Sequence, residues 1–385
     1  MKGVTKGNIK KYALNEFLKE YKELNTDNKY RPVAVGRYGI RKRESIYSKE
    51  LAKDYSKNKL IHKGTLTVGM GSKQIDIGIL IEDETFAVSP AYHTYEIQGI
   101  RCKYLEYCLQ SKNIEMFSLY AKRGSRQGKS IDLKRWLTYK IPVYSEKDQI
   151  VIEENLNKIN YVIELRRKQI DLLDELIKAR FVEMFGDPFL NEKGWITKPL
   201  IDMGNCKNGM NFHYNENGCE VKCLGVGDFK DLSIINNIES LQTVSLNEMP
   251  SEEYMLRDND IVFVRSNGNK ALVGRSIVIY PGDVPTTFSG FCIRYRKYDD
   301  SIIVPYLLHV LKTDSFRNKM VGRGANIQNL NQQILASLII PVPPLQLQNQ
   351  FALFVQEIDK SRSRIQKSLE ASQELFDSLM QEYFG

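Results

Sequence analysis

The sequence has no long hydrophobic run and little cysteine. In 385 residues, no stretch reaches the roughly 20 apolar residues that a membrane-spanning helix needs, and the first eleven residues hold no apolar segment typical of a secretion signal. We therefore expect a cytoplasmic protein without a membrane partner.

The six cysteines include no Cys-x-x-Cys pair, so packed, reduced thiols are favoured over a disulfide framework. Cys206, His213, Cys219 and Cys223 could form a zinc site, but the missing pair favours packing, and we expect no metal.

Motifs of catalysis are also missing. The sequence has no Gly-x-x-x-x-Gly-Lys string of the kind that binds ATP phosphates. The string nearest to an adenine-methyltransferase loop, residues 186–189, lacks the second proline and is interpreted as a helix cap. Glu220-Val221-Lys222 resembles a nuclease tripeptide, but only the distant Asp202 lies upstream. We therefore expect no catalytic residue and no cofactor on this chain, and an enzyme with an unrecognised active site is the weaker hypothesis.

Positive charge is concentrated in the first part of the chain. Residues 1–145 contain 28 Lys and Arg against 15 Asp and Glu, whereas residues 189–344 contain 16 of each. The segments 146–188 and 345–385 are mildly acidic. A basic excess of this kind favours a polyanionic partner such as nucleic acid, although charge alone leaves an ordinary solvated surface equally open.

The sequence contains an internal duplication. Ile141-Pro142-Val143 recurs 199 positions later as Ile340-Pro341-Val342, and Phe185-Gly186 recurs at the same offset as Phe384-Gly385. No gap is needed between these landmarks, and Gln149 falls on Gln348. Chance does not keep such a register over 44 positions, so the chain holds two copies of one plan.

The segments that keep this register are predicted as two long helices, residues 146–187 and 344–385. Apolar residues recur at alternating steps of three and four, which predicts a seam for another helix. Arg166 and Arg362 interrupt the two stripes; a position at the seam edge is favoured over a contact to DNA or a partner. The predicted seam residues are Leu156, Ile159, Ile163, Ile170, Leu173, Ile177, Val355, Ile358, Ile365, Leu369, Phe376 and Leu379.

The remaining segments are predicted as two globular domains, residues 1–145 and 188–343. Short β-rich runs alternate with turn signals, and each domain ends in a short amphipathic helix, so we expect a mixed α/β (α+β) fold. Residues 1–28 are predicted as an extra charged helix without a counterpart in the second domain. The expected architecture is two globular domains that alternate with two long helices packed as an antiparallel coiled coil.

A string at the start of the second helix carries a family resemblance. Residues 341–348, Pro-Val-Pro-Pro-Leu-Gln-Leu-Gln, and the preceding loop of residues 323–330 resemble the specificity subunit of type I restriction-modification systems. The alternation of globular and helical parts resembles that family along nearly the whole chain. The first copy departs from the string, because Tyr144-Ser145 replaces the Pro-Pro pair.

The resemblance implies a non-catalytic DNA-recognition subunit. Each globular part would be a target-recognition domain for one half of a split target in double-stranded DNA, and the helices would set the spacing. The implied partners are two modification (methyltransferase) subunits and, in the full complex, two restriction (translocase-nuclease) subunits. S-adenosylmethionine and ATP would then be bound by these partners. The alternative is a stand-alone sequence-specific or architectural DNA-binding protein.

The candidate DNA-binding residues lie in polar loops at equivalent places of the two halves. Arg can read guanine with two hydrogen bonds, and Asn or Gln can read adenine; a solvated turn is the alternative for each loop. The segment from Arg41 to Arg43 is expected to contact phosphates. The candidates are Arg41, Lys42, Arg43, Ser72, Lys73, Gln74, Lys122, Arg123, Arg126, Gln127 and Lys129, and, in the second half, Arg265, Ser266, Asn267, Asn269, Lys270, Arg323, Asn326, Gln328 and Asn329.

Overall fold

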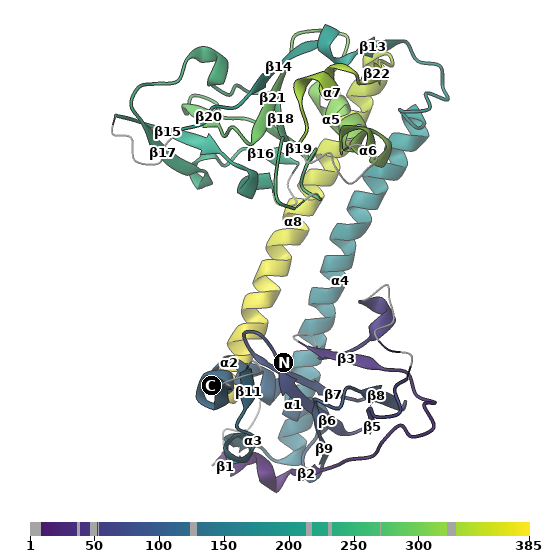
Figure 1. The fold of residues 1–385 in the computed structure, drawn as a ribbon, viewed down its shortest axis with the longest axis vertical. Coiled ribbons are helices and arrows are strands. Elements are labelled where there is room, and N and C mark those ends of the chain that lie inside the picture. Colours follow the sequence, from purple (N-terminus) through teal and green to yellow (C-terminus); the bar gives the residue numbers. More distant parts are fainter. Residues whose placement is uncertain are drawn as a thin grey trace. The chain divides into compact units, whose positions relative to one another are not determined.

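The computed structural model describes residues 9–36, 39–46, 52, 54–123, 129–212, 218–229, 233–269, 271–321 and 329–385. The chain divides into two compact units, of which the first comprises Met1–Gln169 with Ile365–Gly385 and the second comprises Ile170–Arg364. Two 40-residue helices, α4 (Glu146–Phe185) and α8 (Leu345–Phe384), contribute one end to each unit. Each unit therefore consists of one globular part and two helix ends (Figure 1).

The first unit is built on a four-stranded antiparallel sheet with the order β2-β9-β6-β7. Helix α1 packs on β7 of this sheet. Two small antiparallel sheets, the hairpin β3-β4 and the non-consecutive pair β5-β8, extend the unit. The elements are β1 (Lys10–Ala13), β2 (Leu18–Glu20), β3 (Val33–Gly36), β4 (Gly39–Lys42), β5 (Lys59–Ile61), β6 (Thr65–Met70), β7 (Ile75–Ile79), β8 (Phe86–Val88), β9 (His93–Ile97), α1 (Cys102–Ser111), α2 (Asn113–Tyr120), β10 (Ala121–Arg123), β11 (Lys129–Ile131), α3 (Leu133–Trp136) and β12 (Lys140–Val143).

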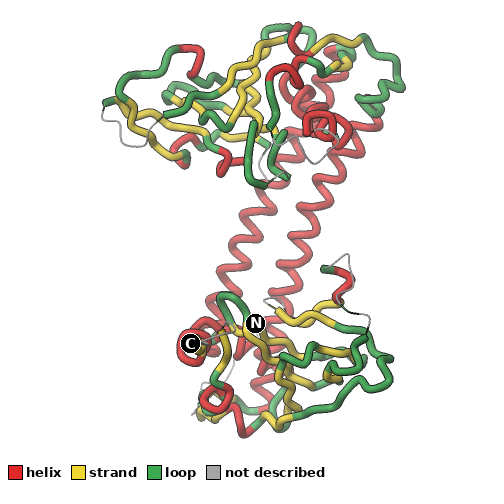
Figure 2. The backbone as a smooth tube through the Cα atoms, viewed as in Figure 1, coloured by secondary structure: helices red, strands yellow, loops and turns green. Residues whose placement is uncertain are grey.

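The second unit has a five-stranded sheet, β14-β21-β18-β19-β16, and a separate three-stranded sheet, β17-β15-β20. Helix α5 packs on β19 (Figure 1). In both units the strands gather in the globular part, whereas α4 and α8 are uninterrupted helices (Figure 2). The elements are β13 (Thr197–Pro199), β14 (Gly204–Asn208), β15 (Cys219–Leu224), β16 (Ile234–Ile235), β17 (Gln242–Leu246), β18 (Asp260–Val264), β19 (Ser276–Ile279), β20 (Thr286–Phe288), β21 (Cys292–Lys297), α5 (Val304–Lys312), α6 (Asp314–Val321), α7 (Gln332–Ala336) and β22 (Ile339–Pro341).

The two units share a frame. The order β2-β9-β6-β7 recurs as β14-β21-β18-β19, and each unit then adds two consecutive helices, a short helix and a last strand in the same chain order. The turn before the central strand is also repeated. The N–H of His62 donates to Thr65 Oγ1 at 3.1 Å, and the N–H of Arg257 donates to Asp260 Oδ2 at 2.7 Å. The residue just before each acceptor, Gly64 or Asn259, has a positive φ of 84° or 70°.

The predicted N-terminal helix over residues 1–28 is wrong. Lys10–Ala13 forms strand β1, which pairs antiparallel with β12, and Leu18–Glu20 forms strand β2 at the edge of the sheet. These strands also have counterparts, because β13 pairs antiparallel with β22 in the second unit. The many charged residues of this segment were interpreted as the polar face of a helix, but edge strands with one solvated face can also carry many lysines. The strand that pairs with β1 lies far along the chain, so no local pattern indicated it.

In the first unit, α4 and α8 pack antiparallel. Leu156 and Ile163, from the start of α4, share a hydrophobic core with Leu379 and Phe384, from the end of α8. The side chain of Asn155 donates to Tyr383 Oη at 3.2 Å. The predicted seam residues of this unit are buried or half-buried: Leu156, Ile159, Ile163, Ile365, Leu369, Phe376 and Leu379.

In the second unit the same arrangement is built from the opposite helix ends. Phe185, at the end of α4, contacts Phe351, near the start of α8, and packs edge-to-face on Tyr306 of α5 at 4.8 Å between ring centroids. Phe384 contacts Tyr104 of α1 in the first unit in the same way, at 5.4 Å. The seam residues of the second unit are again buried or half-buried: Ile170, Leu173, Ile177, Val355 and Ile358.

The polar residues that interrupt the stripes have partners on the facing helix. Arg166 donates to the carbonyl oxygen of Ser368 at 2.6 Å and to the hydroxyl of Ser372. Arg362 forms an ion pair with Asp174. Both arginines are half-buried. Their contacts to the facing helix favour the interpretation as seam-edge residues.

In each unit, a buried glutamine of the long helix forms hydrogen bonds with the backbone of the globular part. Gln149, near the start of α4, is 4% exposed; it accepts the N–H of Arg101 at 3.2 Å and donates to the carbonyl oxygen of Tyr144. Gln348, near the start of α8, is fully buried; it accepts the N–H of Ile303 at 2.9 Å and donates to the carbonyl oxygens of Ser301 and Pro343. The glutamine of the duplicated string thus satisfies backbone groups just before the first turn of α1 or α5.

Candidate nucleic-acid interface

The basic segment Arg41–Arg43 belongs to a hairpin of the first unit. Arg41 and Lys42 are exposed residues of β4, and Arg43 opens a short 3-10 helix, Arg43–Ser45. The Lys42 ammonium lies 3.7 Å from the Glu84 carboxylate. The hairpin presents its charges to solvent, as phosphate contacts require.

Ser72, Lys73 and Gln74 form the tip of the hairpin between β6 and β7. The N–H of Gly71 donates to the carbonyl oxygen of Gln74 at 3.1 Å, which closes the turn. Ser72 and Lys73 are exposed, and Gln74 is half-buried. The turn therefore projects polar side chains from the end of two buried strands.

The predicted loop over residues 122–129 lies between two paired strands. Arg123 in β10 pairs with Lys129 in β11. The Lys122 ammonium lies 2.7 Å from Asp132, whose carboxylate also caps α3. Lys122 thus has a structural partner, although its side chain is 59% exposed. Arg126 and Gln127 lie outside the described residues.

In the second unit, the structure brings two predicted loops together. Ser266 forms an antiparallel β-bridge with Asn329, and the N–H of Leu330 donates to the carbonyl oxygen of Arg265 at 2.8 Å. Asn267 accepts the N–H of Asn269, which shapes the turn after β18. The other candidates of these loops, Lys270, Arg323, Asn326 and Gln328, lie outside the described residues.

These loops line an open cleft with a volume of about 660 Å³. We call it the amide cleft, after the amide side chains in its lining. The lining includes Phe212, Gln242, Ser266, Asn267, Phe291 and Asn329. Three of the six, Ser266, Asn267 and Asn329, were candidates from the sequence. The two phenylalanines and Gln242 were missed, because they come from β17 and from the segments beside β14 and β21, which only the fold assembles.

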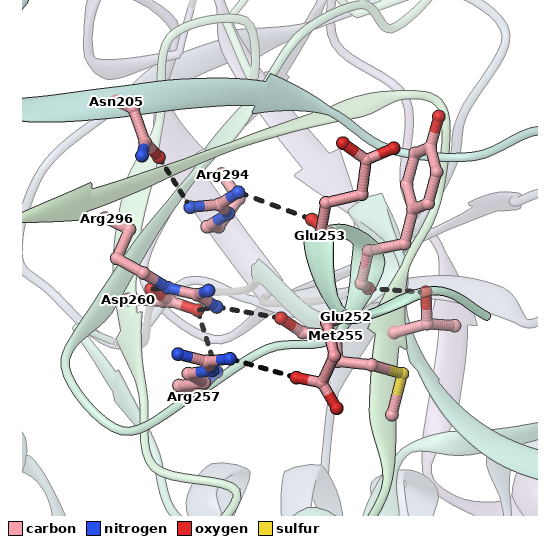
Figure 3. A network of polar contacts seen from close by, with 10 residues as sticks. Asn205, Glu252, Glu253, Met255, Arg257, Asp260, Arg294 and Arg296 are labelled. Carbon is pink, nitrogen blue, oxygen red and sulfur yellow. Dashed lines mark hydrogen bonds and ion pairs between the residues drawn. The ribbon is translucent and has the colours of Figure 1, made fainter.

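A polar network beneath the second unit's surface was also missed (Figure 3). Asp260, which is 1% exposed, accepts from the Arg296 guanidinium at 2.8 and 2.7 Å. Arg294 donates to Asn205 Oδ1 at 2.8 Å, and burial lowers the pKa of this guanidinium. Both arginines also donate to carbonyl oxygens of the segment 253–255. These contacts fix that segment on the sheet, so the arginines have a structural role.

Two cysteines of the second unit, Cys206 and Cys223, lie in surroundings that favour the neutral thiol. Burial raises the pKa of Cys206 to about 11 and that of Cys223 to about 12, so both thiols stay protonated near neutral pH. In the described ranges, no three His, Cys, Asp or Glu side chains are close enough to hold a metal ion.

Among the helices of those same ranges, none is both long and apolar enough to cross a membrane.

Comparison with known proteins finds a family model that matches part of the second half of the chain. Residues 192–373 match the model of the type I restriction modification DNA specificity domain. The matched region contains the amide cleft, the polar network and the first part of α8. The resemblance inferred from residues 341–348 is confirmed.

Curated proteins similar to this chain are specificity subunits. The chain is 24% identical over 261 residues to the StySPI specificity subunit of Salmonella potsdam, which covers 63% of this chain and 55% of that protein. It is 25% identical over 187 residues to the EcoKI specificity subunit of Escherichia coli (strain K12), which covers 46% of this chain and 39% of that protein. The chain thus spans about half the length of the curated relatives that it matches.

Solved structures share the fold along the whole chain. The S subunit of a type I restriction-modification system from M. genitalium has a TM-score of 0.56 at 17% identity, with 100% of this chain and 98% of that chain covered. A chain from a study of complex assembly of the type I R-M system has a TM-score of 0.59 at 15% identity, with 100% and 99% covered. The predicted class, two mixed α/β parts alternating with two long helices, is confirmed.

Proposed function

We propose that this chain is the DNA-recognition subunit of a type I restriction-modification system and has no catalytic role of its own. The match of residues 192–373 to the specificity domain carries the proposal. The first unit reads one half of a split target in double-stranded DNA, the second unit reads the other half, and the helices keep the two halves at a fixed separation. Such a complex works in the cytoplasm, where the DNA is.

The two units have the same sheets and buried contacts but different exposed side chains, which supports recognition of a different DNA sequence by each unit. The sheet order, the turn before the central strand and the buried glutamine are repeated in both units. The exposed residues are not: the first unit presents Arg41 and Lys42 on a hairpin, whereas the second presents amides around a cleft. Base contacts specify sequence, so different side chains on one frame suit two different half-targets.

The outer surface of α4 supports docking of partner subunits. Tyr161 and Leu165 are exposed four residues apart in the first unit, and Leu172 and Leu176 are exposed at the same spacing in the second. Residues four apart share one face of a helix, and exposed apolar side chains in such a row fit a helix of another protein. We assign this face to two modification subunits, which bind S-adenosylmethionine; two restriction subunits, which use ATP, complete the complex.

The docking assignment is tested by co-purification of the tagged full chain from its own organism. Leu172→Glu combined with Leu176→Glu should reduce recovery of a methyltransferase subunit at least tenfold, because two charges replace apolar contacts. Ile114→Glu, at a more exposed apolar position of α2, is the matched control and should leave recovery unchanged. A wild-type chain that binds specific DNA and never recovers a methyltransferase would instead support the stand-alone DNA-binding alternative.

The recognition function itself is tested by mapping methylated adenines in the genome, with and without the gene for this chain. We expect a split motif, two short half-sites separated by a fixed gap, that loses methylation when the gene is removed. An unchanged methylation pattern would contradict the proposal.

A further inference from the structure

The amide cleft of the second unit has a shape that direct reading of an intact duplex does not need. Base edges lie at the bottom of the grooves of DNA, so the protein parts that read them project outward. The amide cleft is a recess instead, and its volume of about 660 Å³ falls in the range of ~300–1,000 Å³ typical of small-molecule sites. A recess of this size can admit a small ligand.

The walls of the cleft are held by backbone contacts. The N–H of Arg265 donates to the carbonyl oxygen of Phe291 at 2.8 Å, and the Arg265 guanidinium donates to the carbonyl oxygen of Gly290. Cys292, next to Phe291, is fully buried in β21. Phe291 itself is nevertheless 60% exposed, so an aromatic side chain is presented from a fixed backbone.

The lining suits a neutral, planar, hydrogen-bonding ligand. Among the described residues that line the cleft there is no Lys or Arg to hold a phosphate, and the carboxylate of Asp228 accepts the N–H of Gly225 at 2.8 Å. The side chains of Gln242, Ser266 and Asn329 make no hydrogen bond to another residue within the described part of the chain. Amides can pair with the edge of a base, and an aromatic side chain can stack on its face.

We propose that the amide cleft receives a single nucleobase rotated out of the DNA duplex, at or beside the half-target that the second unit reads. A base inside the stack cannot enter a recess, whereas an unstacked base presents both its face and its hydrogen-bonding edge. Phe291 stacks on the base, and Asn267, Asn329 and Gln242 bind its edge. This inference rests on the proposed function, because it requires that the chain binds DNA.

The inference is tested by measuring whether a single mismatched base pair raises or lowers the affinity for DNA. The full chain, in the complex that it forms in its own organism, is bound to a short duplex carrying the mapped target, and each base pair in and beside the second half-target is mismatched in turn. A mismatch removes part of the cost of unpairing a base, so at one position it should raise affinity about tenfold. The methyltransferase itself takes the methylated adenine out of the duplex. At all other positions, reading within an intact duplex predicts that every mismatch lowers affinity. At the position of gain, 2-aminopurine should become more fluorescent on binding.

A matched pair of variants assigns this behaviour to the cleft. Phe291→Ala removes the stacking ring and should lower the mismatch gain to less than twofold and abolish the fluorescence increase. Phe189→Ala, which removes another exposed phenylalanine of the second unit, 51% exposed and outside the cleft, should keep both signals.

The outcomes separate the inference from the proposed function. Specific binding in which every mismatch weakens affinity overturns the nucleobase site and leaves the recognition function intact. A gain that survives Phe291→Ala at a position other than the methylated adenine also overturns it, because the unstacked base is then held elsewhere. Absence of specific binding to the mapped target contradicts the recognition function itself.

Discussion

The two units have one backbone plan but different polar anchors. At the turn before the central strand, the first unit uses the hydroxyl of Thr65, whereas the second uses the carboxylate of Asp260, which also binds Arg296. At the long helix, the first unit adds Glu153, which accepts from Arg101 at 2.8 Å, and the aligned residue in the second is Ala352. The two copies of the repeat therefore keep the same backbone geometry. The polar and charged side chains that stabilise this geometry differ between the copies, as do the exposed surfaces.

The largest expected difference between the units follows removal of the Asp260 charge. Asp260→Asn leaves the Arg296 guanidinium in a largely buried site without its counterion, so the second unit should lose about 3–5 kcal/mol of stability. Thr65→Val removes only a hydrogen-bond acceptor and should cost the first unit about 1 kcal/mol. Hydrogen exchange of the intact chain, measured by mass spectrometry for β18 and β6, separates the two. Equal losses would show that the anchors are equivalent after all.

Acid should weaken the second unit through His309. Burial lowers the pKa of His309 from 6.5 to about 4, with a smaller effect of Lys312 and Arg362 in the same direction. Protonation therefore favours the unfolded state, so the contribution is fully present above pH 6.5 and is lost as the pH falls from 6.5 toward 4. The loss is on the order of 3–4 kcal/mol at ~1.4 kcal/mol per pH unit.

His309→Phe should flatten that part of the pH profile, measured as exchange of the α5 segment, and leave the first unit's profile unchanged. His93 of the first unit, whose pKa burial also lowers, is exposed and should contribute less. A profile that stays steep after His309→Phe would assign the acid sensitivity to other groups.

The buried glutamines should show a smaller, local effect in each unit. Gln348→Ala removes three hydrogen bonds and Gln149→Ala removes two, so each variant should cost about 1–3 kcal/mol, with the larger loss for Gln348. Each loss should be confined to its own unit, visible as faster exchange in α5 or α1. The Gln→Glu variants place a buried carboxyl oxygen against the carbonyl oxygens that the amide served, so each should cost at least as much as the alanine variant. Faster hydrogen exchange in both units from a single variant would contradict the claim that each glutamine stabilises only its own unit.

The sequence predicted the repeated frame better than the site. The register from Ile141 to Gly186 and the apolar stripes identified both long helices, because helical packing depends on local periodicity. Strand β1 could not be found in the same way, since its pairing with β12 is non-local and its residues are polar. The amide cleft depends on the bridge between Ser266 and Asn329, which are 63 positions apart in the printed sequence. No local pattern encodes such a bridge.

The smallest expected effect distinguishes how the two units hold DNA. Arg41→Ala with Lys42→Ala should reduce the dependence of log affinity on log salt by up to ~0.9 per lost phosphate contact. Asn267→Ala with Asn329→Ala should leave this slope unchanged, because amide contacts to bases release no counterions. Binding of the complex to its mapped target at several salt concentrations gives both slopes. Equal slopes for the two double variants would contradict the distinction.

The division of reading between the units is tested most directly by mapping methylated adenines in cells that express variants of one unit at a time. Lys73→Ala with Gln74→Ala changes the first unit, and Asn267→Ala with Asn329→Ala changes the second. Each pair should relax the bases of one half-site only, with the gap and the other half-site unchanged. A pair that alters both half-sites together, or a motif without two separable halves, would contradict the account.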